Sequence, residues 1–241
     1  MVSDREHLGK NQVIQSYNNI YQGSDRLLEM PSYYSWVLKR LNVNPGNSLL
    51  DIATGFGTLP LLAEKNQIRA TGVDISIQAI KRALAQGTKR VLVCDGENLP
   101  FPTSSFDYAT NLGSLEHYIN PSKGVQEIHR ILRPYGKAAI FLPNSYYLID
   151  IIRFVLHKGY GPTHNQPIER FATINEWGDL IKANGLKINK VYRYNILFPR
   201  NIEDFKYMKA KPKRFIASLL SPFIPFNLSY SFLYICEKPA N

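Results

Sequence analysis

Residues 49–60 read Leu49-Leu50-Asp51-Ile52-Ala53-Thr54-Gly55-Phe56-Gly57-Thr58-Leu59-Pro60. An apolar run that carries one acid turns there into a glycine-rich loop, and the loop leads into an apolar segment typical of a helix. A strand, a tight loop and a helix in this order bring backbone N–H groups and a helix N-terminus up to a ligand. Because glycine has no Cβ, Gly55 and Gly57 let the backbone turn sharply and let the ligand come close. The stretch therefore predicts a ligand-binding loop after the first strand.

The acid before the loop indicates which ligand fits. A dinucleotide site would have the pattern G-x-G-x-x-G/A, but Pro60 takes its sixth place. Asp51 would also repel a pyrophosphate, whereas it suits a ligand with a cationic amine. The pattern D-x-x-x-G-x-G resembles the first motif of the class I S-adenosylmethionine-dependent methyltransferases. The chain departs from the family at Ala53, where a third glycine is usual.

Length and composition limit the number of domains, the compartment and the classes of partner. The 241 residues fit a single α/β domain over 1–241. The polar N-terminus predicts no signal peptide, and no apolar run approaches the ~20 residues of a membrane span. Cys94 and Cys236 lie in apolar runs, which predicts buried free thiols in a reducing, cytoplasmic compartment. No spacing of Cys and His suggests a metal site. A net charge of +10 raises nucleic acid, anionic substrates and membrane surfaces as partners.

The first 45 residues predict a helical cap. Apolar side chains recur at helical spacing from Val13 to Tyr21, and a second helical segment covers 27–41. One interpretation packs Tyr17 and Tyr21 on the domain. The resemblance implies another, in which the N-terminal helix covers the cofactor and Tyr17 contacts it.

A second acid follows the next predicted strand, residues 68–74. Asp74 comes 23 residues after Asp51, close to the offset of about 20 that one βα unit gives. A carboxylate at this edge can accept hydrogen bonds from both ribose hydroxyls. Ser76 reads as the N-cap of a helix that Gly87 ends. The apolar face of this helix is predicted to hold Ile77, Ile80 and Leu84.

Two further motifs extend the resemblance. A third predicted strand, 90–94, leads to Asp95, and the resemblance implies that Asp95 accepts a hydrogen bond from the adenine amino group. Residues 105–107 resemble the family's Ser-Phe-Asp segment before the fourth strand, and residues 115–117 resemble the Leu-Glu-His segment after it. The resemblance implies a cofactor site made of Tyr17, Asp51, Ala53, Thr54, Gly55, Gly57, Asp74, Ile75, Asp95, Gly96, Asn111 and Leu112.

The resemblance spans residues 48–144 nearly continuously, with four motifs in order. It implies an α/β, Rossmann-like, seven-stranded sheet of order 3-2-1-4-5-7-6, with strand 7 antiparallel and helices on both faces. Asn120 reads as the N-cap of a helix. A capping box at Thr173 starts another. The last three strands are predicted at 137–142, 186–195 and 229–236.

The chemistry needs few groups, because the sulfonium methyl of the implied cofactor is already activated. A base is needed only if the acceptor must first lose a proton. His117 and His164 are the two candidate bases; the alternative is that His117 orients its loop and His164 is solvated. Residues 111–114 lack the N/D-P-P-Y/F segment usual in methyltransferases of nucleic-acid bases, and no carboxylate cluster suggests a metal-dependent enzyme. A small-molecule or amphipathic, lipid-linked acceptor is expected. RNA methylation and a non-catalytic partner protein stay open as alternatives.

The segment 196–228 is predicted as a basic and apolar insert between strands 6 and 7. Between 190 and 214 there are eight basic side chains and two acidic ones, and an apolar run at 215–226 follows. A basic patch beside an apolar segment is typical of an interfacial anchor, here 205–226. A lid over the acceptor pocket is the other interpretation. The two are compatible if the acceptor is a lipid, so peripheral membrane association accompanies the cytoplasmic expectation.

Overall fold

A computed structural model describes residues 8–25, 27–163 and 166–240. Seven strands form one sheet of order β3-β2-β1-β4-β5-β7-β6, which confirms the predicted order. Strand β7 runs antiparallel to both β5 and β6, and the remaining pairs are parallel. The strands are β1 Ser48–Ile52, β2 Arg69–Asp74, β3 Val91–Val93, β4 Phe106–Leu112, β5 Leu132–Pro143, β6 Lys187–Tyr194 and β7 Ser231–Glu237.

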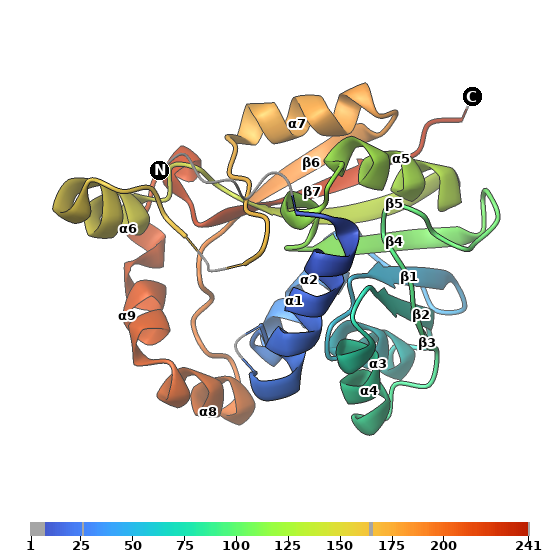
Figure 1. Ribbon diagram of the computed structural model, residues 1–241, viewed down its shortest axis with the longest axis horizontal. Coiled ribbons are helices and arrows are strands. Elements are labelled where there is room, and N and C mark those ends of the chain that lie inside the picture. The colour runs from blue at the N-terminus through green and yellow to red at the C-terminus, as the bar shows by residue number, and fades with distance from the viewer. Residues whose placement is uncertain (1–7, 26, 164–165, 241) are drawn as a thin grey trace.

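Helices cover both faces of the sheet (Figure 1). The longer ones are α1 Lys10–Gly23, α2 Pro31–Leu41, α3 Thr58–Lys65, α4 Ile77–Ala85, α5 Pro121–Ile131, α7 Ile174–Ala183, α8 Ile202–Ala210 and α9 Pro212–Leu220. The short ones are η2 Leu115–His117, α6 Leu148–Asp150, the π-helical turn η3 Ile151–Leu156, η4 Ser221–Phe223 and η5 Phe226–Leu228.

The core has two layers because neighbouring strand residues point to opposite faces. Leu50 and Ile52 belong to a cluster with α5 and α7, whereas Leu49 belongs to a cluster with α2 and α3. A strand buried on both faces reads as an unbroken apolar run, as residues 49–52 do around Asp51. Asp51 is thereby held at the carboxyl end of β1 by packing on both sides.

Two local predictions are wrong. Helix α4 turns a different face to the core: Ile77 and Leu84 are 47% and 53% exposed, and the buried face consists of Ala79, Ile80 and Ala83. Small side chains let α4 lie close to β2 and β3, which leaves the larger ones outside. Strand β5 begins at Leu132 instead of residue 137, because Leu132 already pairs with Phe106.

The segment between β6 and β7 folds as α8 and α9 beside the N-terminal helices. Met208 of α8 packs with Met30 and Ile196 in a small separate core. Figure 1 shows α6, α8 and α9 gathered at one end of the molecule. Cys94 and Cys236 are buried free thiols. Over the described ranges, no helix is long and apolar enough to cross a membrane.

Candidate functional site

The loop after β1 forms the floor of the site. Ala53 and Gly55 both adopt left-handed backbone, with φ of 60° and 55°. This conformation costs an alanine about 1 kcal/mol and costs glycine little. A Cβ on Gly55 would lie 2.8 Å from the Tyr21 hydroxyl, so glycine leaves room for helix α1 to lie directly over the loop.

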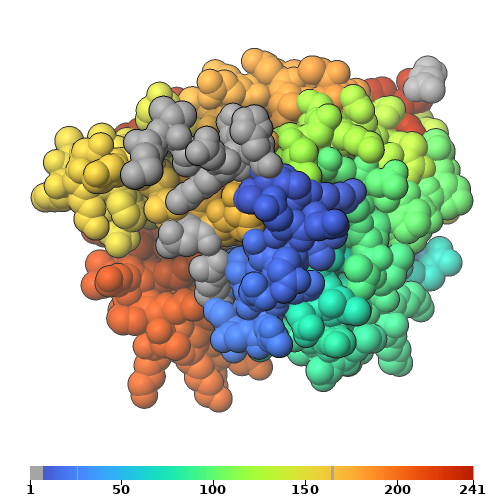
Figure 2. Space-filling view, in the orientation of Figure 1, coloured from blue at the N-terminus to red at the C-terminus, as the bar shows by residue number. Residues whose placement is uncertain are grey.

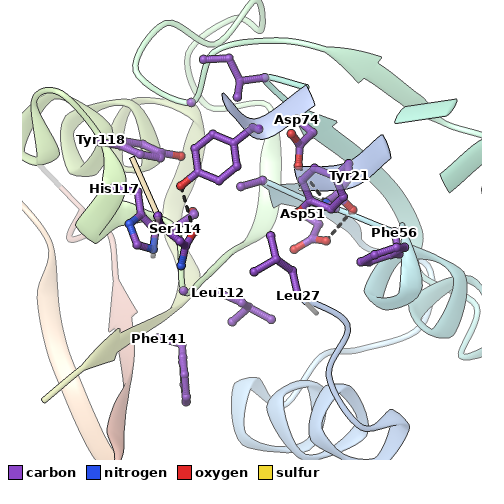
Figure 3. Close-up of a pocket in the computed structure, with 18 of the residues that line it drawn as sticks. Tyr21, Leu27, Asp51, Phe56, Asp74, Leu112, Ser114, His117, Tyr118 and Phe141 are labelled. Atoms are coloured by element: carbon purple, nitrogen blue, oxygen red, sulfur yellow. Dashed lines mark hydrogen bonds between the residues drawn. The ribbon is translucent and has the colours of Figure 1, made fainter. Parts of the chain in front are cut away.

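Two buried carboxylates stand beside this loop (Figure 3). Asp51 accepts hydrogen bonds from the hydroxyls of Thr54 at 2.7 Å and Thr110 at 2.6 Å. Asp74 accepts from the backbone N–H groups of Gly55 at 2.9 Å and Ser76 at 2.8 Å. Burial raises the pKa of each carboxyl to about 6, although these hydrogen bonds oppose the shift. No salt bridge among the described residues reaches either acid.

A cavity of about 440 Å³ opens above these acids, at the edge of the sheet where the strand order reverses between β1 and β4. Open α/β sheets bind ligands at this edge, and the volume is in the range of small-molecule pockets. Ten of the twelve residues predicted for the cofactor line the cavity: Tyr17, Asp51, Ala53, Thr54, Gly55, Asp74, Ile75, Asp95, Gly96 and Leu112.

The other two predicted residues do not line the cavity. Gly57 is the N-cap of α3, and a Cβ there would collide with Thr88 behind the loop. The Asn111 side chain donates to the Tyr118 hydroxyl at 3.0 Å and accepts from the Leu115 N–H at 3.1 Å. Both residues therefore shape the backbone around the cavity.

The predicted adenine end lies under the start of α1. Lys10 donates a hydrogen bond from Nζ to Asp95 Oδ2, and the Glu97 N–H donates to Oδ1 at 3.0 Å. A Cβ on Gly96 would collide with the Tyr118 ring. Glycine at this position therefore allows the chain to pass close to Tyr118.

A buried acid and histidine follow β4 on η2. His117 lines the cavity, and its Nδ1 is hydrogen-bonded to the Ile168 carbonyl. Because a carbonyl only accepts, Nδ1 carries the proton and the neutral ring has its lone pair on Nε2. Glu116 Oε1 lies 3.6 Å from that Nε2, and burial raises the pKa of Glu116 to about 8. Within the described part of the chain Glu116 Oε2 has no hydrogen-bond partner. His164 lies outside the described residues.

The far half of the cavity is aromatic, and the sequence did not predict it. Rings of Tyr33 and Phe141 lie 5.3 Å apart, and those of Phe141 and Tyr194 lie 5.1 Å apart, in edge-to-face contact. Tyr34 and Tyr230 complete this wall. These five residues come from four distant segments, so no local pattern could have linked them.

The segment 196–228 supplies one partner of an ion pair in the same half of the cavity. Arg214 of α9 and Glu29 both line it, with Nη1 2.5 Å from Oε2 and Nη2 2.8 Å from Oε1. Lys211 donates to the Leu28 carbonyl at 3.2 Å. These two cations, which the sequence analysis counted in a surface patch, thus bind internal partners. Among the residues described, no group of three or more His, Cys, Asp or Glu side chains could hold a metal ion.

A family model and several curated proteins match part of this chain. The family model described as "Methyltransferase domain" matches residues 50–140. A 2-methyl-6-phytyl-1,4-hydroquinone methyltransferase of rice is 33% identical over 49% of this chain and 33% of its own length. A demethylmenaquinone methyltransferase of Corynebacterium kroppenstedtii is 31% identical over 42% of this chain and 44% of its own. The chain thus spans less than half of these curated relatives.

A solved structure extends the likeness to most of the chain. An S-adenosylmethionine-dependent methyltransferase of Thermotoga maritima superposes with a TM-score of 0.60 at 21% identity. The match covers 85% of this chain and 89% of the other. At this identity the likeness shows a shared fold.

Proposed function

Because the chain carries the methyltransferase domain of the class I S-adenosylmethionine-dependent family over residues 50–140, we propose that it methylates a small-molecule or lipid-linked acceptor. The observation that carries the proposal is the pair of buried carboxylates at the glycine loop, neither of which forms a salt bridge with any residue that the structure describes. When bound, S-adenosylmethionine supplies a methyl group that its positive sulfur has already activated.

The residues present fit this cofactor. A cationic ligand would offset the cost of ionising two acids whose pKa burial raises to about 6. In this proposal Asp51 receives the amine of the methionine end and Asp74 receives the ribose hydroxyls. The adenine amino group would share Asp95 with Lys10.

The aromatic half of the cavity supports an acceptor with a planar ring. Edge-to-face aromatic walls favour the stacking of another ring. The two curated relatives are named for a phytyl hydroquinone and for demethylmenaquinone, so prenylated hydroquinones are the first acceptors to test. His117 would accept the proton of an acceptor hydroxyl at Nε2 while the Ile168 carbonyl holds the ring in place. Contact of residues 205–226 with a membrane would bring such an acceptor to the site.

The alternatives gain no support. The non-catalytic interpretation was motivated by Ala53 and by the lack of a certain base. Ala53 adopts the left-handed conformation that suits the family's glycine, and His117 lines the cavity. RNA methylation was motivated by the net charge, and two of the cations counted between 190 and 214, Arg214 and Lys211, bind partners inside the molecule; the RNA arm of the acceptor test below decides this alternative.

Calorimetry with S-adenosylhomocysteine tests the cofactor site. We expect binding by the wild type and at least tenfold weaker binding by Asp74→Asn, with Asp179→Asn, an exposed acid on α7, as the control. No binding at millimolar ligand would overturn the proposal. Labelled cofactor incubated with prenylated hydroquinones, simple phenols and RNA then identifies the acceptor.

A further inference from the structure

Helix α9 exposes a row of apolar side chains although other apolar side chains of the same helix pack inward. Its inner side carries Phe215 and Ala217, which pack against the core around Met208, together with Arg214, which reaches Glu29, and the buried Ser218. Its outer face carries Ile216, Leu219 and Leu220, which are 59%, 50% and 48% exposed. Surface helices normally bury such side chains and expose the charged ones. Folding alone therefore leaves this apolar face unexplained.

A second apolar segment from another part of the chain is exposed in the same way. Along η3, Val155 and Leu156 are 46% and 72% exposed, and Tyr160 after it is 75% exposed. The sequence analysis noted no role for this stretch. Its side chains contribute little to the core, so it too presents an apolar ridge to the outside.

Residues that flank the two segments bind each other directly. Asn144 donates from Nδ2 to the carbonyls of Asn227 at 2.9 Å and Ser229 at 2.8 Å. The rings of Tyr147 and Tyr230 lie 5.1 Å apart in edge-to-face contact. Figure 2 shows the yellow segment of α6 and η3 and the orange-red segment of α8 and α9 at the same side of the molecule.

Exposed cations accompany both apolar segments. Arg153 and Lys158 stand on the first segment, and Lys206, Lys209 and Lys213 stand on α8 and α9. Of the two acids of α8, Glu203 is exposed, whereas Asp204 is buried and accepts the Arg200 and Ser32 N–H groups. The outward charge of this side is therefore positive even without Arg214 and Lys211.

We propose that these two segments, residues 152–160 and 206–226, form one docking surface for a bilayer with anionic headgroups. Aliphatic and aromatic side chains beside lysines suit a lipid interface, where each cation adds about 1 kcal/mol. Charge complementarity favours this occupant over a second copy of the chain, since two basic surfaces repel. The inference rests on the proposed function in one respect: α9 also walls the acceptor half of the cavity through Arg214, which suits a lipid-linked acceptor.

Co-sedimentation of the full chain with vesicles tests the surface. We expect binding to phosphatidylcholine vesicles that contain phosphatidylglycerol, loss of binding as salt rises, and little binding to phosphatidylcholine alone. The variants Leu219→Ser/Leu220→Ser and Lys209→Glu/Lys213→Glu should each reduce the bound fraction at least fivefold. The matched controls lie on and beside α4: Ile77→Ser/Leu84→Ser, of similar exposure, and Lys81→Glu/Lys89→Glu, also exposed. Both controls should bind as the wild type does.

Three outcomes would overturn the docking surface. They are no binding to anionic vesicles at low salt, an equal loss of binding in the α4 controls, and a dimer in solution that Leu219→Ser/Leu220→Ser dissociates. S-adenosylhomocysteine affinity, measured in parallel, should be unchanged in all four variants. Vesicle binding by a protein that does not bind S-adenosylhomocysteine would support the surface and overturn only the proposed function.

Discussion

Arg214 and Glu29, which are 185 positions apart in the chain, form a two-pronged ion pair in the wall of the cavity. The pair ties α9 to the linker between α1 and α2. Tyr207 extends it, because its hydroxyl accepts from Arg214. The segment between β6 and β7 is thus fixed to the N-terminal segment across the aromatic half of the cavity.

We predict that Arg214 and Glu29 are energetically coupled. In a double-mutant cycle with Arg214→Gln and Glu29→Gln, urea denaturation should give a coupling free energy of about 1–3 kcal/mol, because each single variant leaves its partly buried partner unpaired. Lys182 and Asp179, an exposed pair on α7, should give less than about 0.5 kcal/mol. Coupling no larger than in that control pair would contradict the role of the ion pair as a tether.

Cofactor affinity should fall in acid. Asp51 and Asp74 have pKa values of about 6 in the folded protein, and their ionised forms are the ones that accept hydrogen bonds from a cationic ligand. Below pH 6 the ligand must compete with protons, so affinity for S-adenosylhomocysteine should drop about tenfold or more from pH 7 to pH 5. Calorimetry checks this, with circular dichroism to verify folding at pH 5. A flat profile would show that neither carboxylate binds the ligand.

Glu116→Gln should stabilise the protein at alkaline pH. Burial raises the pKa of Glu116 to about 8 in the folded state, whereas the unfolded chain has an ordinary value near 4.5. Both states hold the proton below pH 4.5, so the stability contribution is complete there and is lost as pH rises to 8. The glutamine variant avoids that loss. Urea denaturation should show nearly equal stability near pH 4.5 and a gain of about 4 kcal/mol at pH 8, the order of magnitude that a pKa rise from 4.5 to about 8 gives.

The exposed Glu203→Gln is the control for that measurement and should change stability equally at both pH values. A destabilising Glu116→Gln at pH 8 would mean that Glu116 is ionised beside His117, which lies 3.6 Å away.

Residue 53 should tolerate glycine and reject β-branched side chains. Ala53 has a φ of 60°, so Ala53→Gly relieves strain while adding freedom to the unfolded chain, and its stability should lie within about 1 kcal/mol of the wild type. Ala53→Val should cost about 2 kcal/mol or more, because valine adopts this backbone poorly. Ala70→Gly, in the buried strand β2, is the contrasting control and should destabilise. Thermal melts of the three variants, each compared with the wild type, test this prediction.

The residues predicted for the cofactor meet at one cavity because each motif that carries them is local. Asp51 and Asp74 end neighbouring parallel strands, so the register of β1 on β2 alone brings their side chains to one loop. The strand order was predicted through the family resemblance and is confirmed. The spacing of large apolar residues predicted the wrong buried face for α4. Ala79 and Ala83, which are buried there, do not enter such a pattern.

The aromatic half of the cavity could not be predicted by the same reasoning. Tyr33, Phe141 and Tyr194 meet only through tertiary packing, and no spacing in the sequence relates them. In the sequence, Arg214 is one more cation in a basic run. Only the structure shows that Glu29 lies opposite it. Glu116 was visible in its motif, but its deep burial follows from the packing around η2.

The two walls of the cavity have different origins along the chain. Residues 50–140, the part that matches the family model, carry Asp51, Asp74 and Asp95. The opposite wall comes from segments on either side of that stretch, around Tyr33 and around Tyr194. Substitutions around Tyr33 and Tyr194 can therefore reshape the aromatic wall while Asp51, Asp74 and Asp95 stay in place.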